Sequence, residues 1–77
     1  MKKFILYIME GCPYVETVQN FAEQFGIEFE TRDIGDPAIS EELVERGGKR
    51  QVPYLVDVEN AVEMYESEDI IGYLQAQ

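Results

Sequence analysis

The stretch Phe4–Glu16, with the sequence FILYIMEGCPYVE, decides the fold of this chain. It opens on an uninterrupted apolar run, Phe4 to Ile8, whose residues favour strands. Because the run has no alternating polar face, it predicts a central strand that is covered on both sides. Gly11 ends this strand. Pro13 then suits the first position of a helix, where a backbone N–H is not needed.

Beyond Pro13 the hydrophobic period changes to that of a helix. Apolar residues recur at steps of three and four, which places them on one helix face: Val15, Val18, Phe21, Ala22 and Phe25. Gly26 supplies the stop. From Ile27 to Arg32 apolar and charged residues alternate, so a second strand is expected there.

A second helix is predicted after Asp36 and Pro37, which are suited to its N-cap and first turn. Ile39, Leu43 and Val44 mark this short helix, and the pair Gly47-Gly48 closes it. Glu41, Glu42 and Glu45 give it an acidic face, for which a metal-binding role is not favoured.

Two strand-like runs follow, Tyr54–Val58 and Ala61–Tyr65. Only Glu59 and Asn60 separate them, which predicts a tight hairpin. Ser67 is the expected N-cap of a last helix, whose inward face consists of Ile70, Ile71 and Leu74.

The predicted order is β-α-β-α-β-β-α. The first half is a βαβ unit with parallel strands, and the second half adds an antiparallel hairpin and a closing helix. The fold class is therefore α/β, with a four-stranded mixed sheet flanked by three helices. We expect one domain over residues 1–77, without linkers or repeats.

Composition limits the possible functions. The 77 residues include one cysteine and no histidine, so an intrachain disulfide and the usual zinc-binding sets are missing. A formal charge of −10 repels nucleic acid and anionic membranes. The apolar run after Lys2 and Lys3 is too short for a secretory signal or a membrane span. A monomer in the cytoplasm, where a lone cysteine stays reduced, is expected.

Cys12 is the candidate catalytic residue. It falls at the carboxyl end of the first strand and the amino end of the first helix, where unpaired N–H groups and the helix dipole converge. Such a position stabilises a thiolate relative to a thiol, and the thiolate is the nucleophile. The alternative is that Cys12 is a small buried apolar residue.

Three pieces of the sequence together resemble the glutaredoxin family of the thioredoxin-like superfamily. They are GCPYV after the first strand, RQVPYLVD before the hairpin and YESEDIIGYL entering the last helix. The last two also resemble the N-terminal domain of glutathione transferases. The resemblance implies a thioredoxin-like fold and glutathione-dependent thiol–disulfide oxidoreductase activity, with glutathione as co-substrate and no tightly bound cofactor.

The resemblance also implies a role for individual residues. Cys12 corresponds to the nucleophile, and Tyr14 to the aromatic residue that flanks glutathione. Val52 and Pro53 match the pair whose cis-proline exposes a backbone edge for the cysteinyl portion. Ser67 and Glu68 match the helix start that holds the γ-glutamyl carboxylate, while Arg50 or Gln51 would reach the glycyl carboxylate.

Two departures from the family pattern bear on this mechanism. Val15 stands where a dithiol glutaredoxin has its second cysteine, which leaves the monothiol route: a second glutathione must resolve the adduct on Cys12. Val15 itself is interpreted as a core residue. Met9 replaces a common lysine, and the nearby Glu10 and Glu16 oppose a thiolate.

The expected partners are glutathione and glutathionylated or disulfide-containing proteins. Another small thiol or a thioredoxin-type reductase would serve if the source lacks glutathione. Two alternatives remain open. One is an iron–sulfur carrier in which two chains and two glutathiones supply the ligands. The other is a non-catalytic module that binds glutathione or proteins.

Overall fold

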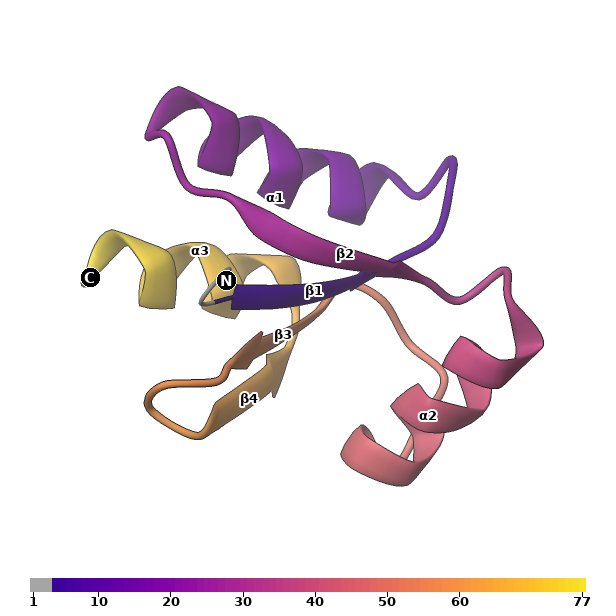
Figure 1. The fold of residues 1–77 in the computed structure, drawn as a ribbon. Coiled ribbons are helices and arrows are strands. Elements are labelled where there is room, and N and C mark those ends of the chain that lie inside the picture. The colour runs from indigo at the N-terminus through magenta and orange to yellow at the C-terminus, as the bar shows by residue number, and fades with distance from the viewer. Residues whose placement is uncertain (1–3) are drawn as a thin grey trace.

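A single mixed sheet organises the protein, which is described here for residues 4–77 of a computed structural model (Figure 1). The elements are β1 (Phe4–Ile8), α1 (Pro13–Gln24), β2 (Phe29–Asp33), α2 (Pro37–Gly47), β3 (Tyr54–Asp57), β4 (Val62–Tyr65) and α3 (Ser67–Gln75). Their order confirms the predicted β-α-β-α-β-β-α fold. Residues 1–3 of the predicted domain lie outside the described part.

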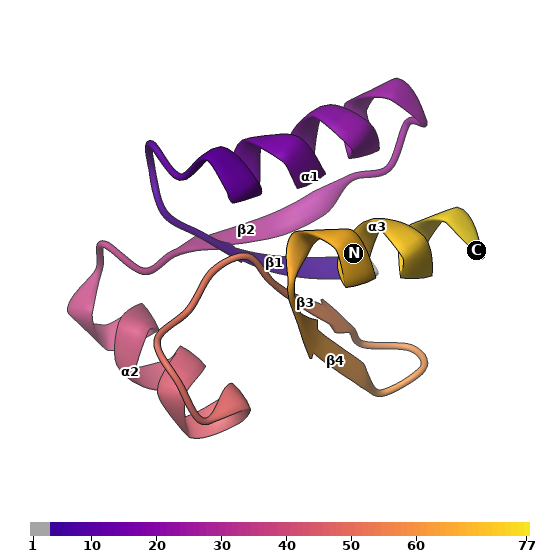
Figure 2. The same ribbon diagram turned by 180° about the vertical axis from the view of Figure 1, so that it is seen from behind.

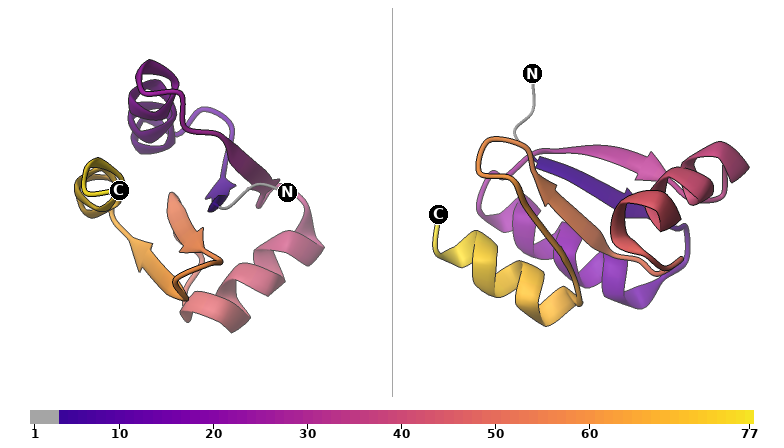
Figure 3. Two further views of the ribbon diagram at one scale, coloured as in Figure 1. Left: turned by 60° about the vertical axis from the view of Figure 1, so that its left-hand side comes forward. Right: turned by 90° about the horizontal axis from the view of Figure 1, so that it is seen from below.

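The strand order is β2-β1-β3-β4, so β1 is central as its apolar run predicted. It pairs in parallel with β2 and antiparallel with β3, which pairs antiparallel with β4. Figures 1 and 2 show the four strands between the helices from opposite sides. The end-on view in Figure 3 places α1 and α3 on one face of the sheet and α2 on the other.

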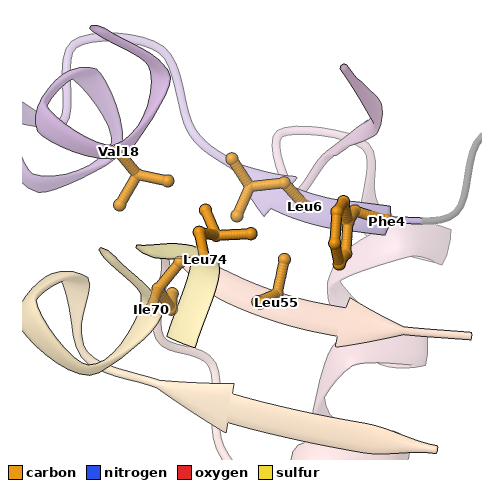
Figure 4. Close-up of a cluster of buried hydrophobic side chains, with 6 residues drawn as sticks. All are labelled: Phe4, Leu6, Val18, Leu55, Ile70 and Leu74. Atoms are coloured by element: carbon orange, nitrogen blue, oxygen red, sulfur yellow. The ribbon is translucent and has the colours of Figure 1, made fainter. Parts of the chain in front are cut away.

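Alternate residues of the strands fill the two resulting core layers. Under α1 and α3 the buried side chains are Phe4, Leu6, Val18, Leu55, Ile70 and Leu74 (Figure 4). Against α2 the cluster is Tyr7, Ile34, Leu43, Tyr54 and Val56. The burial of both faces explains why β1 and β3 show no polar alternation.

The predicted boundaries hold for the first two helices. Asp36 is the N-cap of α2 and accepts a hydrogen bond of 2.9 Å from the Ala38 N–H. Gly48 caps its other end with φ 95°, a conformation that glycine adopts without steric cost. Val15 is 3% exposed, which confirms that it packs in the core.

Two predictions about the second half are wrong. The hairpin connection spans residues 58–61 rather than Glu59-Asn60 alone, because the Asp57 carboxylate binds the Asn60 N–H and side-chain amide and so draws the turn around itself. The N-cap of α3 is Glu66, at φ 71°, and Ser67 is already the first helical residue. The preference of serine for N-cap positions does not reveal that the residue before it takes the cap with a positive φ.

Matched glycine substitutions test the packing around two helices. In Gly72→Ala the new methyl group has no neighbour within 4 Å among the described residues, so better helix propensity should raise the unfolding free energy by roughly 0.5–1 kcal/mol. In Gly47→Ala it would run into the Tyr65 hydroxyl and lie 3.1 Å from a Tyr54 ring carbon, which should lower stability by about 1–3 kcal/mol. Urea titration of both variants measures the two changes in unfolding free energy. Equal changes would contradict the close approach of Tyr65 and Tyr54 to Gly47.

The ion pair between β2 and α2 gives stability a pH dependence. Glu42 accepts bonds from Arg32 Nε at 2.7 Å and Nη2 at 2.9 Å and from the Tyr7 hydroxyl. The Arg32 and Tyr7 bonds hold the pKa of Glu42 below its ordinary value of 4.5, so this stabilisation is present above that pH and is lost as the pH falls through the folded pKa.

We therefore expect Glu42→Gln to lower the unfolding free energy by up to about 1 kcal/mol near pH 7, since the pair is partly exposed. The difference from the parent protein should shrink as the pH falls below 4.5. Thermal melts at several pH values measure it. Glu45→Gln, which alters an exposed neighbour on the same helix, is the control; a difference independent of pH would contradict the assignment.

Candidate functional site at the carboxyl end of the central strand

The strand register brings three separate parts of the chain to one edge of the sheet. Tyr7 of β1 is paired with Tyr54 of β3, and Tyr54 is paired with Tyr65 of β4. Cys12 follows the end of β1, Pro53 directly precedes β3 and Ser67 follows β4, so all three meet beyond this row. The site therefore results from the topology, not from proximity in sequence.

Cys12 is positioned by a tight turn and by the helix that it caps. Its N–H donates to the Met9 carbonyl oxygen at 3.3 Å, across Gly11 at φ 83°, and its own carbonyl accepts from the Glu16 N–H at 3.1 Å. Its side chain makes no capping hydrogen bond and is only half-buried. Cys12 is thus neither a side-chain cap nor fully buried, unlike the buried apolar cysteine of the alternative interpretation.

The first turn of α1 leaves backbone donors beside this sulfur. Pro13 has no N–H, and within residues 4–77 the N–H groups of Tyr14 and Val15 have no hydrogen-bond partner. Such donors and the helix dipole favour negative charge. Glu16 in the same turn opposes them, as the sequence predicted.

A groove of about 630 Å³ opens next to this helix start. Its lining is Tyr14, Gln51, Val52, Pro53, Glu66, Ser67, Glu68 and Asp69. The structure thus brings together most of the residues that the sequence selected. Cys12 itself is not in the lining; along the chain it lies two residues before Tyr14, whose side chain is 64% exposed.

Two features of the groove provide backbone hydrogen-bonding groups. The Val52–Pro53 bond is cis, as the resemblance implied, and among the described residues the Val52 N–H and C=O make no hydrogen bond. Within the described range, the N–H groups of Ser67, Glu68 and Asp69 at the start of α3 also make no hydrogen bond, and these residues line the same groove. Extended peptide can pair with the first, and a carboxylate with the second.

The segment before Pro53 is held by side chains on both sides. Gln51 Nε2 donates to Glu66 Oε1 at 3.1 Å, which connects it to the start of α3. The Tyr65 hydroxyl donates to the Lys49 carbonyl oxygen at 2.7 Å, and Lys49 Nζ lies 4.9 Å from the centre of the Tyr65 ring. The groove wall is therefore fixed to β4 and α3.

Arg50 lies outside the groove. Its Nε donates to Ser40 Oγ at 2.8 Å, and it lines a separate hollow against α2. Gln51 is the member of the predicted pair that lines the groove. Glu66 and Asp69 also line it and were missed by the sequence analysis, although both flank the Ser67-Glu68 pair at the same helix start.

Within residues 4–77, no group of three His, Cys, Asp or Glu side chains is placed to hold a metal ion. In the same range no helix is long and apolar enough to cross a bilayer.

Comparison with known families agrees with this geometry. The model of the glutathione S-transferase N-terminal domain matches residues 6–77. The chain belongs to this family. No protein of curated function gives a match.

Solved structures of glutathione transferases are similar to this chain over nearly its whole length. A glutathione S-transferase from the Antarctic clam Laternula elliptica is 27% identical, with a TM-score of 0.81, over 97% of this chain and 35% of that one. Glutathione transferase Omega 3C from Trametes versicolor is 22% identical, with a TM-score of 0.83, over 99% of this chain and 34% of that one. The chain therefore spans about a third of the length of these transferases.

A glutaredoxin from Brucella melitensis is similar over 99% of this chain and 82% of its own, at 24% identity and a TM-score of 0.70. This likeness shows the fold, which is thioredoxin-like. It does not establish the chemistry of Cys12.

A positive charge introduced at position 9 should increase the reactivity of Cys12. In Met9→Lys a cation replaces an exposed apolar side chain three residues before Cys12, and it should attract the negative charge that develops on the attacking sulfur. We expect alkylation by neutral iodoacetamide at pH 7 to be roughly threefold to tenfold faster.

Val58→Lys adds the same charge at an exposed position of the hairpin connection and is the control for this prediction. It should leave the rate within about twofold of the parent's, because surface charges more than a Debye length apart are screened. Equal acceleration by both substitutions would show that the effect is not local.

Proposed function

We propose that this domain reduces mixed disulfides of glutathione through Cys12 alone. The observation that supports the proposal most strongly is the position of the half-buried, uncapped Cys12 at the start of α1, next to a groove that offers both a free backbone edge and a free helix start. A reducing compartment such as the cytosol suits this chemistry.

In the proposed binding mode, the groove takes glutathione in three parts. The γ-glutamyl carboxylate accepts bonds from the N–H groups of Ser67 and Glu68 at the start of α3. The cysteinyl portion pairs with the Val52 backbone, and the exposed Tyr14 ring flanks it. The glycyl end extends toward Gln51.

The reaction needs one protein thiolate and two glutathione molecules. Cys12 Sγ attacks the glutathione sulfur of the mixed disulfide, so a Cys12–glutathione disulfide forms as the substrate S–S bond breaks. The substrate leaves as a thiolate and takes up a proton. A second glutathione thiolate then attacks the glutathione sulfur of the adduct, which releases oxidised glutathione and regenerates the Cys12 thiolate.

Cys12→Ser tests the proposal. We expect it to abolish the enzyme-dependent release of glutathione from a glutathionylated peptide, measured by coupling oxidised glutathione to glutathione reductase. Asn20→Ser, an exposed change on the same helix, is the control and should retain full activity. An unchanged rate in Cys12→Ser would contradict the mechanism.

Glutathione binding separates catalysis from binding alone. Calorimetric titration of Cys12→Ser should give a dissociation constant within about threefold of the parent's, because the groove contacts are retained. If the parent protein and Cys12→Ser bind glutathione with the same affinity but the parent protein shows no turnover, the domain is a binding module and the catalytic proposal is wrong.

A further inference from the structure

Acidic side chains lie on both sides of Cys12. The groove beside Tyr14 is lined by Glu66, Glu68 and Asp69. A second hollow, of about 550 Å³, is lined by the segment before Cys12 and by residues of α1 and β2: Ile8, Met9, Glu10, Gly11, Val15, Glu16, Gln19 and Asp33. Cys12 lies along the chain between Gly11, which lines the second hollow, and Tyr14, which lines the groove.

Among residues 4–77 no cation lines either hollow, and the cations of that range are engaged elsewhere. Arg32 binds Glu42, and Arg46 lies 3.4 Å from Glu63. Lys49 lies against the Tyr65 ring, and Arg50 binds Ser40. The charge next to the sulfur is therefore left uncompensated by the described residues.

We propose that the mixed disulfides reduced by this domain are on basic peptide segments, with lysine or arginine beside the glutathionylated cysteine. This inference rests on the proposed function and specifies its substrate class. While glutathione occupies the groove, the acidic hollow formed by Glu10, Glu16 and Asp33 remains next to Cys12 for the peptide. Its carboxylates attract a cationic segment and repel an acidic one.

The electrostatic preference acts on the encounter and on the first transfer. The substrate peptide is present only until it leaves as a thiol, whereas the second glutathione reacts with an adduct that is the same for every substrate. A basic segment should therefore raise the rate of peptide release and leave the resolving step unchanged.

Two glutathionylated peptides of equal length test the inference, one with lysines and one with glutamates on both sides of the cysteine. At low ionic strength we expect the second-order rate constant for peptide release to be about fivefold to twentyfold higher for the lysine peptide. Near 0.5 M salt, where the screening length is only about 4 Å, the ratio should fall below about twofold. The rates with free glutathione alone are subtracted.

Matched triple variants separate the local charges from the net charge of the chain. Glu10→Gln, Glu16→Gln and Asp33→Asn together remove the three charges of the acidic hollow, and the asparagine keeps the oxygen that accepts from the Gly35 N–H. Glu23→Gln, Glu28→Gln and Glu59→Gln remove three exposed charges that line neither hollow. The first triple should reduce the lysine-to-glutamate ratio to about twofold or less, and the second should leave it within a factor of two of the parent's. The ratio cancels any change in the reactivity of Cys12 itself.

The outcomes distinguish this inference from the proposed function. If both peptides are reduced at equal rates in a Cys12-dependent manner, the function stands and the substrate preference is wrong. Equal loss of preference in the two triples would also overturn it, because net charge would then be responsible. If neither peptide is reduced, the proposed function itself fails.

Discussion

The antiparallel pairing of β3 with both β1 and β4 is the constraint on which the site depends. It aligns Tyr7, Tyr54 and Tyr65 across the sheet, and beyond that row the chain provides Cys12, Pro53 and Ser67 in turn. A shift of one residue in this register would turn the buried side chains of β3 to the opposite face. The two core layers therefore fix the position of the groove as firmly as any contact within it does.

Much of this arrangement could be predicted from the sequence, and the reasons are physical. The apolar run of β1, the proline after Cys12 and the Asp36 cap each act locally, so their pattern determines their structure. The start of α3 could not be placed to the residue, because Glu66 adopts a positive φ of 71° that its residue type does not signal. The hairpin was misjudged for a similar reason: Asp57 holds Asn60 through side-chain bonds that strand periodicity does not reveal.

In the candidate site, too, some residues could be assigned from the sequence and others could not. Residues that use their backbone, such as Val52 and Ser67, fall in the groove because the topology brings them there. Long side chains were harder to assign, since Arg50 reaches Ser40 on α2 and leaves Gln51 in the groove. The excess of carboxylates around Cys12 was visible in part, at Glu10 and Glu16. Its full extent depends on Asp33, Glu66 and Asp69, which only the fold brings to the same edge.

The packing of Val15 has a consequence for how long an adduct on Cys12 would persist. That side chain is 3% exposed and belongs to the core. Because Cys12 is the one cysteine of these 77 residues, none of them offers a second thiol that could displace glutathione from its sulfur. Under the proposed mechanism, the lifetime of the adduct is then set by the supply of thiol from outside. The fraction of molecules that carry the adduct would then report the ratio of reduced thiol to disulfide in the surroundings.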